Sequence, residues 1–374
     1  MVDKVFTDSG GILYRYAFDK IRTRYFVKEF EQQFSDYFKV PYTLAVSSGS
    51  AALKLSLQAL GIGRGDEVIT QAHTFIATIE AICEVGARPV IVNIDKSLNM
   101  DPTELSKAIT TKTKAIIPVH MGGVACKMNE ILEEANEQCI FVLEDNAQSP
   151  GGCYKGKYLG TLGDIGIFSM DGGKMLTTGE GGMILTSDKT LFERARGFSD
   201  HGHAENPNVP RGEDDMIGLG FNYKMMELQG AVGQVQLSKL PTILEDHRRN
   251  KSKLKIYLKK ELDGIIEFRE IPNPDGDIGD SLTFFLPTKN QAQRFVTEWK
   301  KRGLPLKNLP GACRWHFAPN WKHIKMNISH NKKSMNPSKN IIERTVEIPI
   351  RGKMTDDDIN KIVVNMKETL KMIQ

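Results

Sequence analysis

Residues 164–186 read DIGIFSMDGGKMLTTGEGGMILT. The apolar runs at 164–168 and 183–186 are typical of buried β-strands, and a glycine-rich segment lies between them. A lysine in such a segment is usually just a solvated loop residue. Lys174, however, follows a buried-type strand in a turn-rich segment that can hold its backbone rigidly near a ligand. The position therefore suits a lysine that forms a Schiff base with a carbonyl group.

Outward from this stretch, short β-rich runs alternate with helix-like runs between residues 45 and about 190, a pattern that indicates βαβ units. The expected strands are residues 67–70, 89–94, 114–119, 140–143, 164–168 and 183–186. A helix is expected at 50–60, where good helix formers stop at Gly61, and another begins at Asp101 with a proline in its first turn. The pattern predicts an α/β fold with a mainly parallel sheet.

The pattern changes after about residue 240. A Lys/Arg-rich amphipathic helix is followed by a segment rich in Pro, Gly and Asn at 271–280. A strand at 281–287 and helices at 290–303 and 355–373 then indicate a smaller α+β unit. We therefore expect a large domain with an N-terminal arm at 1–245 and a small domain at 246–374.

Composition narrows the class of protein. The chain has 374 residues, 40% of them hydrophobic, which is enough to bury substantial cores. Its net charge of +4 is too slight to indicate nucleic-acid binding. No apolar run reaches about 18 residues, and the first residues lack the regions of a secretory signal, so we expect a cytoplasmic protein without membrane spans.

The cysteines are scattered and lack the CxxC spacing of zinc or redox sites. They are Cys83, Cys126, Cys139, Cys153 and Cys313. We interpret them as reduced thiols and expect no metal site.

Residues 46–53, VSSGSAAL, run from a strand end through small residues into a helix. Exposed N–H groups and the positive end of the helix attract a phosphate there, and Ser50 adds a hydroxyl donor. Taken alone, the pattern favours an N-cap without a ligand.

A second polar site follows the strand at 140–143, where Glu144 and Asp145 precede amide and hydroxyl side chains. Ligands of open α/β sheets bind beyond the carboxyl ends of the strands, so Asp145 lies where a site is expected. Its carboxylate could bind a metal, cap a helix or protonate a pyridine nitrogen. A metal needs further ligands, and only Glu144 is available locally.

Two later segments allow two interpretations each. The small residues of the helix in 218–237 predict close packing, either within one subunit or between two. Residues 311–321, GACRWHFAPNW, concentrate aromatic side chains and His316, and they form either a substrate wall or part of the core.

Taken together and in order, six motifs resemble the DegT/DnrJ/ArnB-type sugar aminotransferases, a branch of the fold-type I pyridoxal-5′-phosphate (PLP) enzymes. The resemblance covers about residues 20–240. The motifs are SGSAAL at 48–53, HTFIAT at 73–78, VHMGG at 119–123, EDNAQ at 144–148, Lys174 with TGEGG at 178–182, and GFNYKM at 220–225. The resemblance implies a mostly parallel seven-stranded sheet between helices, with a smaller C-terminal α+β domain.

The resemblance also implies roles for individual residues. Lys174 binds PLP as a Schiff base and moves the proton in the 1,3-shift. Asp145 pairs with the protonated pyridine nitrogen and keeps the ring an electron acceptor. The remaining cofactor contacts are Gly49, Ser50 and Ser169 to the phosphate, Phe75 stacked on the ring, Gln148 at the ring hydroxyl, and Asn222 reaching the phosphate from the partner of a homodimer.

Two positions depart from the family pattern. Residues 170–173, MDGG, replace the usual aromatic and proline before the lysine, which predicts a more flexible loop. Lys224 replaces an arginine, so the charge is kept while a bidentate contact is lost. Family members that act as dehydratases carry histidine in place of the Schiff-base lysine, so the presence of Lys174 favours transamination.

The expected reaction takes nitrogen from an amino donor, typically glutamate, and transfers it to a sugar carbonyl. We expect the acceptor to be the 8-oxo form of a 3-deoxy-octulosonate, giving 8-amino-3,8-dideoxy-manno-octulosonate for lipopolysaccharide biosynthesis. The alternatives are a nucleotide-linked keto-sugar and, from another class, a non-catalytic regulatory or binding protein. Candidate substrate residues are His316, Arg211 and Arg314.

Overall fold

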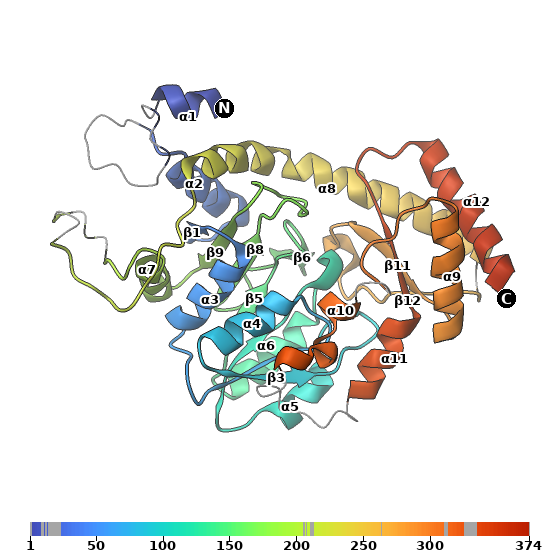
Figure 1. Cartoon of the computed structure of the whole chain (residues 1–374), viewed down its shortest axis with the longest axis horizontal. Coiled ribbons are helices and arrows are strands. Elements are labelled where there is room, and N and C mark those ends of the chain that lie inside the picture. Colours follow the sequence, from blue (N-terminus) through green and yellow to red (C-terminus); the bar gives the residue numbers. More distant parts are fainter. Residues whose placement is uncertain are drawn as a thin grey trace.

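The computed structural model describes residues 2–8, 11, 13, 24–204, 206, 208–209, 213–262, 264–309, 313–324 and 335–373, without the side chains of 313 and 314. A seven-stranded sheet in the order β1-β9-β8-β5-β4-β2-β3 forms the centre of this part (Figure 1). Its strands are β1 Tyr42–Val46, β2 Glu67–Gln71, β3 Arg88–Val92, β4 Thr113–Ile117, β5 Phe141–Asp145, β8 Ile165–Ser169 and β9 Gly182–Thr186. Strands β8, β5, β4, β2 and β3 are parallel, and β9 runs antiparallel to both of its neighbours. The predicted mostly parallel sheet is confirmed.

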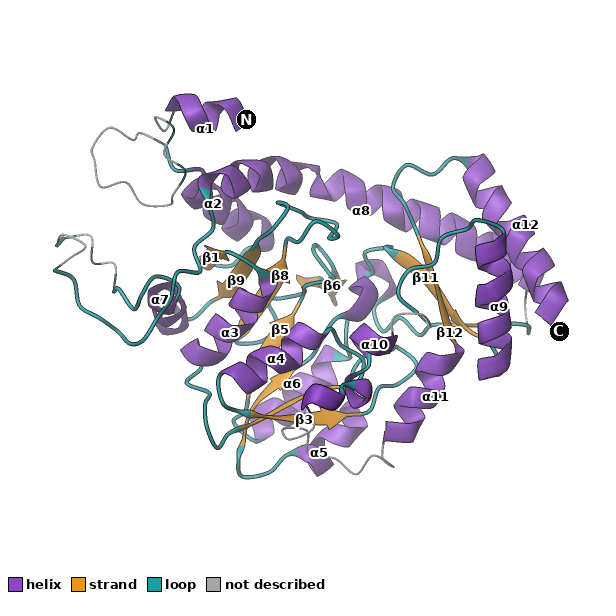
Figure 2. Ribbon diagram, viewed as in Figure 1, coloured by secondary structure: helices purple, strands orange, loops and turns teal. Residues whose placement is uncertain are grey.

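Helices cover both faces of the sheet (Figure 2). The apolar side chains of a strand alternate between the faces, so Val68 packs toward α3 Gly49–Ala59 and α4 Ile76–Glu84, whereas Ile69 packs toward α6 Met128–Glu137. Helix α7 Lys189–Phe198 lies on the α3 side, and α2 Phe26–Phe38 lies on the opposite side. Both faces are buried, as the near-continuous apolar strands require.

A second, smaller core surrounds the antiparallel sheet of β10 Glu267–Phe268, β11 Ser281–Phe285 and β12 Thr345–Pro349. Helices α9 Lys289–Lys301 and α12 Asp356–Ile373 pack on it. The other described elements are α1 Val2–Asp8, η1 Pro102–Glu104, α5 Leu105–Ala108, η2 Met121–Gly123, β6 Cys153–Tyr154, β7 Lys157–Tyr158, η3 Pro274–Gly276, α10 Cys313–His316, η4 Ala318–Asn320, η5 Lys322–Ile324 and α11 Asn336–Arg344.

Helix α8 Glu227–Leu262 connects the two cores and contains Pro241 (Figure 1). Its first half, with Leu237 and Leu244, packs on the α2 side of the large sheet, whereas Leu254 and Leu258 belong to the smaller core. The expected domain boundary at 245/246 falls inside this helix. The change of packing partner along α8 supports that division, which stays a prediction.

The small residues at the start of α8 pack within the subunit. A Cβ at Gly230 would lie 2.7 Å from the backbone nitrogen of Val27, and one at Gly233 would lie 2.6 Å from the ring of Phe30. Glycine at these two positions therefore allows α8 to approach α2 closely. This close packing lies within one subunit, which is the first of the two interpretations of the segment at 218–237.

Cys83, Cys126, Cys139 and Cys153 are free thiols, and the side chain of Cys313 lies outside the described part. In the described part of the chain, no helix combines the length and apolarity that crossing a membrane requires.

Candidate active site

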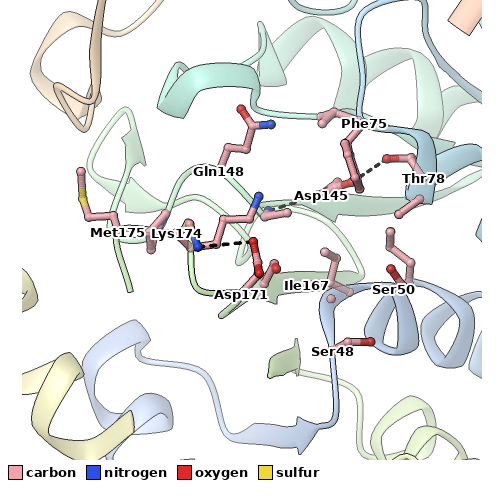
Figure 3. Close-up of a pocket in the computed structure, with 18 of the residues that line it drawn as sticks. Ser48, Ser50, Phe75, Thr78, Asp145, Gln148, Ile167, Asp171, Lys174 and Met175 are labelled. Atoms are coloured by element: carbon pink, nitrogen blue, oxygen red, sulfur yellow. Dashed lines mark hydrogen bonds between the residues drawn. The ribbon is translucent and has the colours of Figure 1, made fainter. Parts of the chain in front are cut away.

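A cavity of about 590 Å³ opens at the carboxyl ends of the parallel strands, the edge at which open α/β sheets bind their ligands (Figure 3). It brings together side chains from the starts of α3 and α4, the ends of β5 and β8, and the loop that follows β8. The predicted site residues that line it are Gly49, Ser50, Phe75, Asp145, Gln148, Ser169, Lys174 and His316.

Asp145 is the last residue of β5 and its side chain lies at the wall of the cavity. Its Oδ2 accepts a hydrogen bond from Thr78 Oγ1 at 2.9 Å, and its Oδ1 accepts one from the Ala147 N–H at 3.1 Å. Burial raises the pKa of Asp145, although these two hydrogen bonds and the charge of Lys174 oppose the shift. A cationic ring nitrogen in the cavity would compensate the buried charge, so the site fits a protonated pyridine.

Glu144, one residue earlier on the strand, points to the opposite face and has no access to the cavity. Its carboxylate accepts hydrogen bonds from the N–H groups of Gly160, Leu162 and Gly163 at 2.6–2.9 Å. His120 completes the set at 3.2 Å; because its Nδ1 accepts the Cys126 N–H, its Nε2 carries the proton and donates it. Glu144 is therefore a structural residue, and the two adjacent acids do not form a joint site.

The turn before α3 forms a cradle for an anion. Ser48 caps the helix by accepting the Ala51 N–H at 3.1 Å, which leaves Ser50 at the cavity. A Cβ at Gly49 would lie 2.7 Å from Ser169 Cβ, so only glycine allows the helix start to approach the end of β8 this closely. The capping interpretation is confirmed, by Ser48. The helix N-terminus and the hydroxyls of Ser50 and Ser169 also fit a phosphate group, whose binding there stays a prediction.

Lys174 follows the end of β8 in a turn that its backbone N–H closes on the Asp171 carbonyl at 2.9 Å. Figure 3 shows Lys174 and Asp145 at the same space. Burial lowers the pKa of Lys174, against the charges of Asp145 and Asp171, which favours the neutral, nucleophilic amine. The loop at 170–173, predicted to be more flexible, is held by backbone hydrogen bonds at Met170. The Met170 N–H donates to the Gly181 carbonyl at 2.8 Å, and the Met170 carbonyl accepts the Thr178 N–H at 2.9 Å.

The side chain of Gln148 is oriented by a neighbouring loop. Its Oε1 accepts the Gly122 N–H at 2.9 Å, so its Nε2 is the group that can donate toward a ring hydroxyl. The loop is held in turn by Arg269, whose buried guanidinium donates to the carbonyls of Ser97 and Met121 at 2.6 and 2.8 Å.

Aromatic side chains form another part of the wall. Phe75 is 43% exposed, and its ring centroid lies 5.7 Å from that of His316. Within residues 313–321, His316 lines the cavity, Phe317 and Trp321 are buried in a core cluster, and Trp315 is exposed. His316 therefore forms part of the cavity wall, as the first interpretation of this segment expects, whereas Phe317 and Trp321 belong to the core, as the second expects.

Three predicted residues are not placed at the cavity. Asn222 is exposed and does not line it, so its contact with a partner's phosphate stays a prediction. Arg211 and the side chain of Arg314 lie outside the described residues. Lys224 forms an ion pair with Asp200, so its charge has a partner in this subunit.

The sequence motifs gave no role to several side chains of the site. Thr78 is in a quoted motif, yet only the fold shows its bond to Asp145. Lys307 and Asp280 line the cavity from the smaller core, in segments without a recognisable motif.

Residues 18–367 match the sequence profile of the DegT/DnrJ/EryC1/StrS aminotransferase family. The chain belongs to this family. Membership confirms the expected family and fold class, together with an aminotransferase-type enzyme and its pyridoxal phosphate cofactor.

Individual proteins are also similar to this chain. The GDP-perosamine synthase of Escherichia coli O157:H7 is 40% identical over 243 residues; the match covers 65% of this chain and 64% of that enzyme. The X-ray structure of the aminotransferase from Psychrobacter cryohalolentis has a TM-score of 0.87 at 26% identity, covering 100% of this chain and 96% of that one. The crystal structure of NtdA from Bacillus subtilis with bound cofactor PMP shares the fold, with a TM-score of 0.85 at 24% identity over 99% of this chain and 81% of that one.

These similarities bear on the expected acceptor. The relative at 40% identity is named for a GDP-linked sugar, which favours the nucleotide-sugar alternative. The octulosonate acceptor, expected first from the sequence, receives no support from them.

Proposed function

We propose that this protein is a PLP-dependent aminotransferase that moves an amino group from an amino-acid donor, glutamate, to the keto group of a nucleotide-linked sugar. The observation that carries the proposal is that Lys174, Asp145 and the start of α3 at Gly49 line one cavity, with Lys174 close enough to act on the charge of Asp145. An amine, a buried acid and an anion site at these positions match three separate parts of one cofactor molecule.

PLP, when bound, supplies an electron-accepting ring that stabilises a carbanion at the carbon bearing the transferred nitrogen. Asp145 would hold the proton of the ring nitrogen, and the hydrogen bond from Thr78 would orient its carboxylate for that contact. Lys174 Nζ would accept and return the proton that transamination moves, a role that the burial and lowered pKa of this amine support. Phe75 and His316 exclude water from one side of the cavity.

The nucleotide-linked acceptor rests on the name of the relative from E. coli, and the donor rests on the family resemblance. The cavity has charged and aromatic walls in the described part of the chain, which suit a polar substrate. His316, at the cavity and beside Phe75, is the described side chain best placed to contact a sugar hydroxyl.

A homodimer is part of the proposal. The segment around Asn222 exposes Leu219, Phe221 and Met226 with 89%, 61% and 49% of their surface accessible. Neighbouring apolar side chains that are this exposed suit contact with a second subunit, which would bring Asn222 toward the partner's cradle.

Single-turnover spectroscopy tests the proposal. Purified protein incubated with PLP should absorb as a lysine-bound cofactor, and borohydride should fix the cofactor to Lys174. Glutamate should then convert it to the pyridoxamine form, and a GDP-linked keto-sugar should restore the original absorbance. Protein that leaves PLP unbound would support the non-catalytic alternative, and restoration by the octulosonate aldehyde alone would refute the nucleotide-sugar acceptor.

A further inference from the structure

Part of the wall of the cavity comes from the smaller core. Lys307, in the loop after α9, and Asp280, immediately before β11, both line the cavity and form an ion pair with each other. Their side chains are 21% and 28% exposed, so each is partly desolvated while still reachable from the cavity.

The charges around the cavity leave one fixed cation available for a substrate. Its acidic lining residues in the described part are Asp145, Asp171, Glu180 and Asp280. Lys174 and Lys307 are the described lysines of the lining, and no described arginine belongs to it. In the proposed function, Lys174 takes part in the reaction itself. Lys307 has three N–H donors, and its ion pair with Asp280 uses one of them, so the others can bind a substrate.

We propose that Lys307 binds a carboxylate of the amino-acid donor, with Asp280 holding the ammonium in place between turnovers. The inference rests on the proposed function, because it assigns the donor's anchor within the same cavity. The charge of Lys307 adds to the effect of burial in lowering the pKa of Lys174, and the charge of Asp280 opposes it. Both lysines line the same cavity, so a donor held at Lys307 lies in the cavity that also contains the lysine with which its amino group must exchange.

The backbone around Lys307 is organised before any ligand arrives. The Lys307 N–H donates to the Glu347 carbonyl at 2.9 Å, and the Asn308 N–H donates to Glu347 Oε2 at 3.1 Å. Glu347 is buried on β12 and its Oε1 accepts the hydroxyl of Ser281 at 3.0 Å. An anchor whose backbone is held by β12 loses little backbone entropy when it binds a ligand.

The test uses the full-length protein loaded with PLP and the substitution Lys307→Met. We expect the glutamate concentration for half-maximal conversion of the cofactor to rise on the order of tenfold or more, since a lost ion pair of about 1.4 kcal/mol corresponds to that factor. The slow reaction with ethylamine, a donor without a carboxylate, should change much less than the reaction with glutamate, because it loses only the influence of the Lys307 charge on Lys174. Succinate should inhibit the wild type and the matched control Lys289→Met, and it should inhibit Lys307→Met on the order of tenfold less.

Lys289 suits the control because it also pairs with a carboxylate, Glu343 at 2.8 Å, and does not line the cavity. An unchanged glutamate requirement in Lys307→Met would overturn the inference. An equal loss with glutamate and ethylamine would also overturn it, because the defect would then concern the cofactor. A wild type that takes up no PLP would refute the proposed function instead, and succinate protection against thermal unfolding, compared between wild type and Lys307→Met, would still decide the role of the lysine.

Discussion

Replacing Glu144 by glutamine should destabilise the protein strongly although the two side chains have the same shape. The carboxylate is fully buried and accepts four hydrogen bonds, two on each oxygen. Glutamine offers one oxygen and one NH₂ group, so in either orientation two buried donors face another donor. On the His120 side a change of tautomer offers no relief, because Nδ1 already accepts the Cys126 N–H.

The expected cost follows from these two orphaned donors. A buried donor without a partner costs about 1–3 kcal/mol, which gives roughly 2–6 kcal/mol for two. Removing a buried charge also removes part of the free-energy cost of its desolvation. We therefore expect Glu144→Gln to lower the free energy of unfolding by about 2–4 kcal/mol. Urea unfolding of the apo protein at pH 7, followed by circular dichroism, measures this difference.

Glu133→Gln, on the exposed side of α6, is the matched control and should change stability by less than about 0.5 kcal/mol. Because Glu144 faces away from the cavity, the folded fraction of the Glu144→Gln variant should still bind PLP. A loss of stability below about 1 kcal/mol would refute the hydrogen-bond argument.

Four further substitutions address the cavity. Lys174→Ala should abolish turnover and borohydride fixation yet retain reversible PLP binding at the cradle, as measured by equilibrium dialysis. Burial raises the pKa of Asp145 above its unfolded value, so its ionisation destabilises the apo fold as pH rises. Asp145→Asn should therefore raise the free energy of unfolding of the apo protein, measured in urea, at neutral pH but not in acid. The same substitution should lower turnover by about 10²–10³-fold. Gly49→Ala places a Cβ 2.7 Å from Ser169 Cβ and should weaken PLP binding by about 1–3 kcal/mol in absorbance titrations. Ser48→Ala removes the cap of α3 and should lower the unfolding free energy by about 1 kcal/mol in urea.

Local patterns were sufficient to predict much of the large sheet. Buried strands with β-branched residues, and a helix ending at Gly61 with a φ of 76°, leave few alternatives to a parallel α/β arrangement. The position of Asp145 at a strand end was predictable for the same reason, because the site of an open sheet lies at that edge.

The remaining features depend on contacts between segments distant in the sequence. Helix α2 was not predicted, because its phenylalanines are buried by α8 and by Phe168 of β8, which lie far away in the sequence. Lys307 and Asp280 become neighbours only when the loop after α9 meets the start of β11. The predicted role of Asn222 is a contact with a second chain. The sequence of one chain shows the motif that contains Asn222, but it does not show that contact.

The unbroken course of α8 also bears on how the cavity can close. The helix belongs to both cores, so the wall that carries Lys307 cannot swing on a flexible linker at the predicted boundary. Pro241 has no N–H for the Leu237 carbonyl, but Leu237 and Leu244 on both sides of it pack on the large sheet, so that turn moves with the larger core. We therefore expect closure of the cavity to be a small bend of α8 between Leu244 and Leu254, where the helix passes from one core to the other.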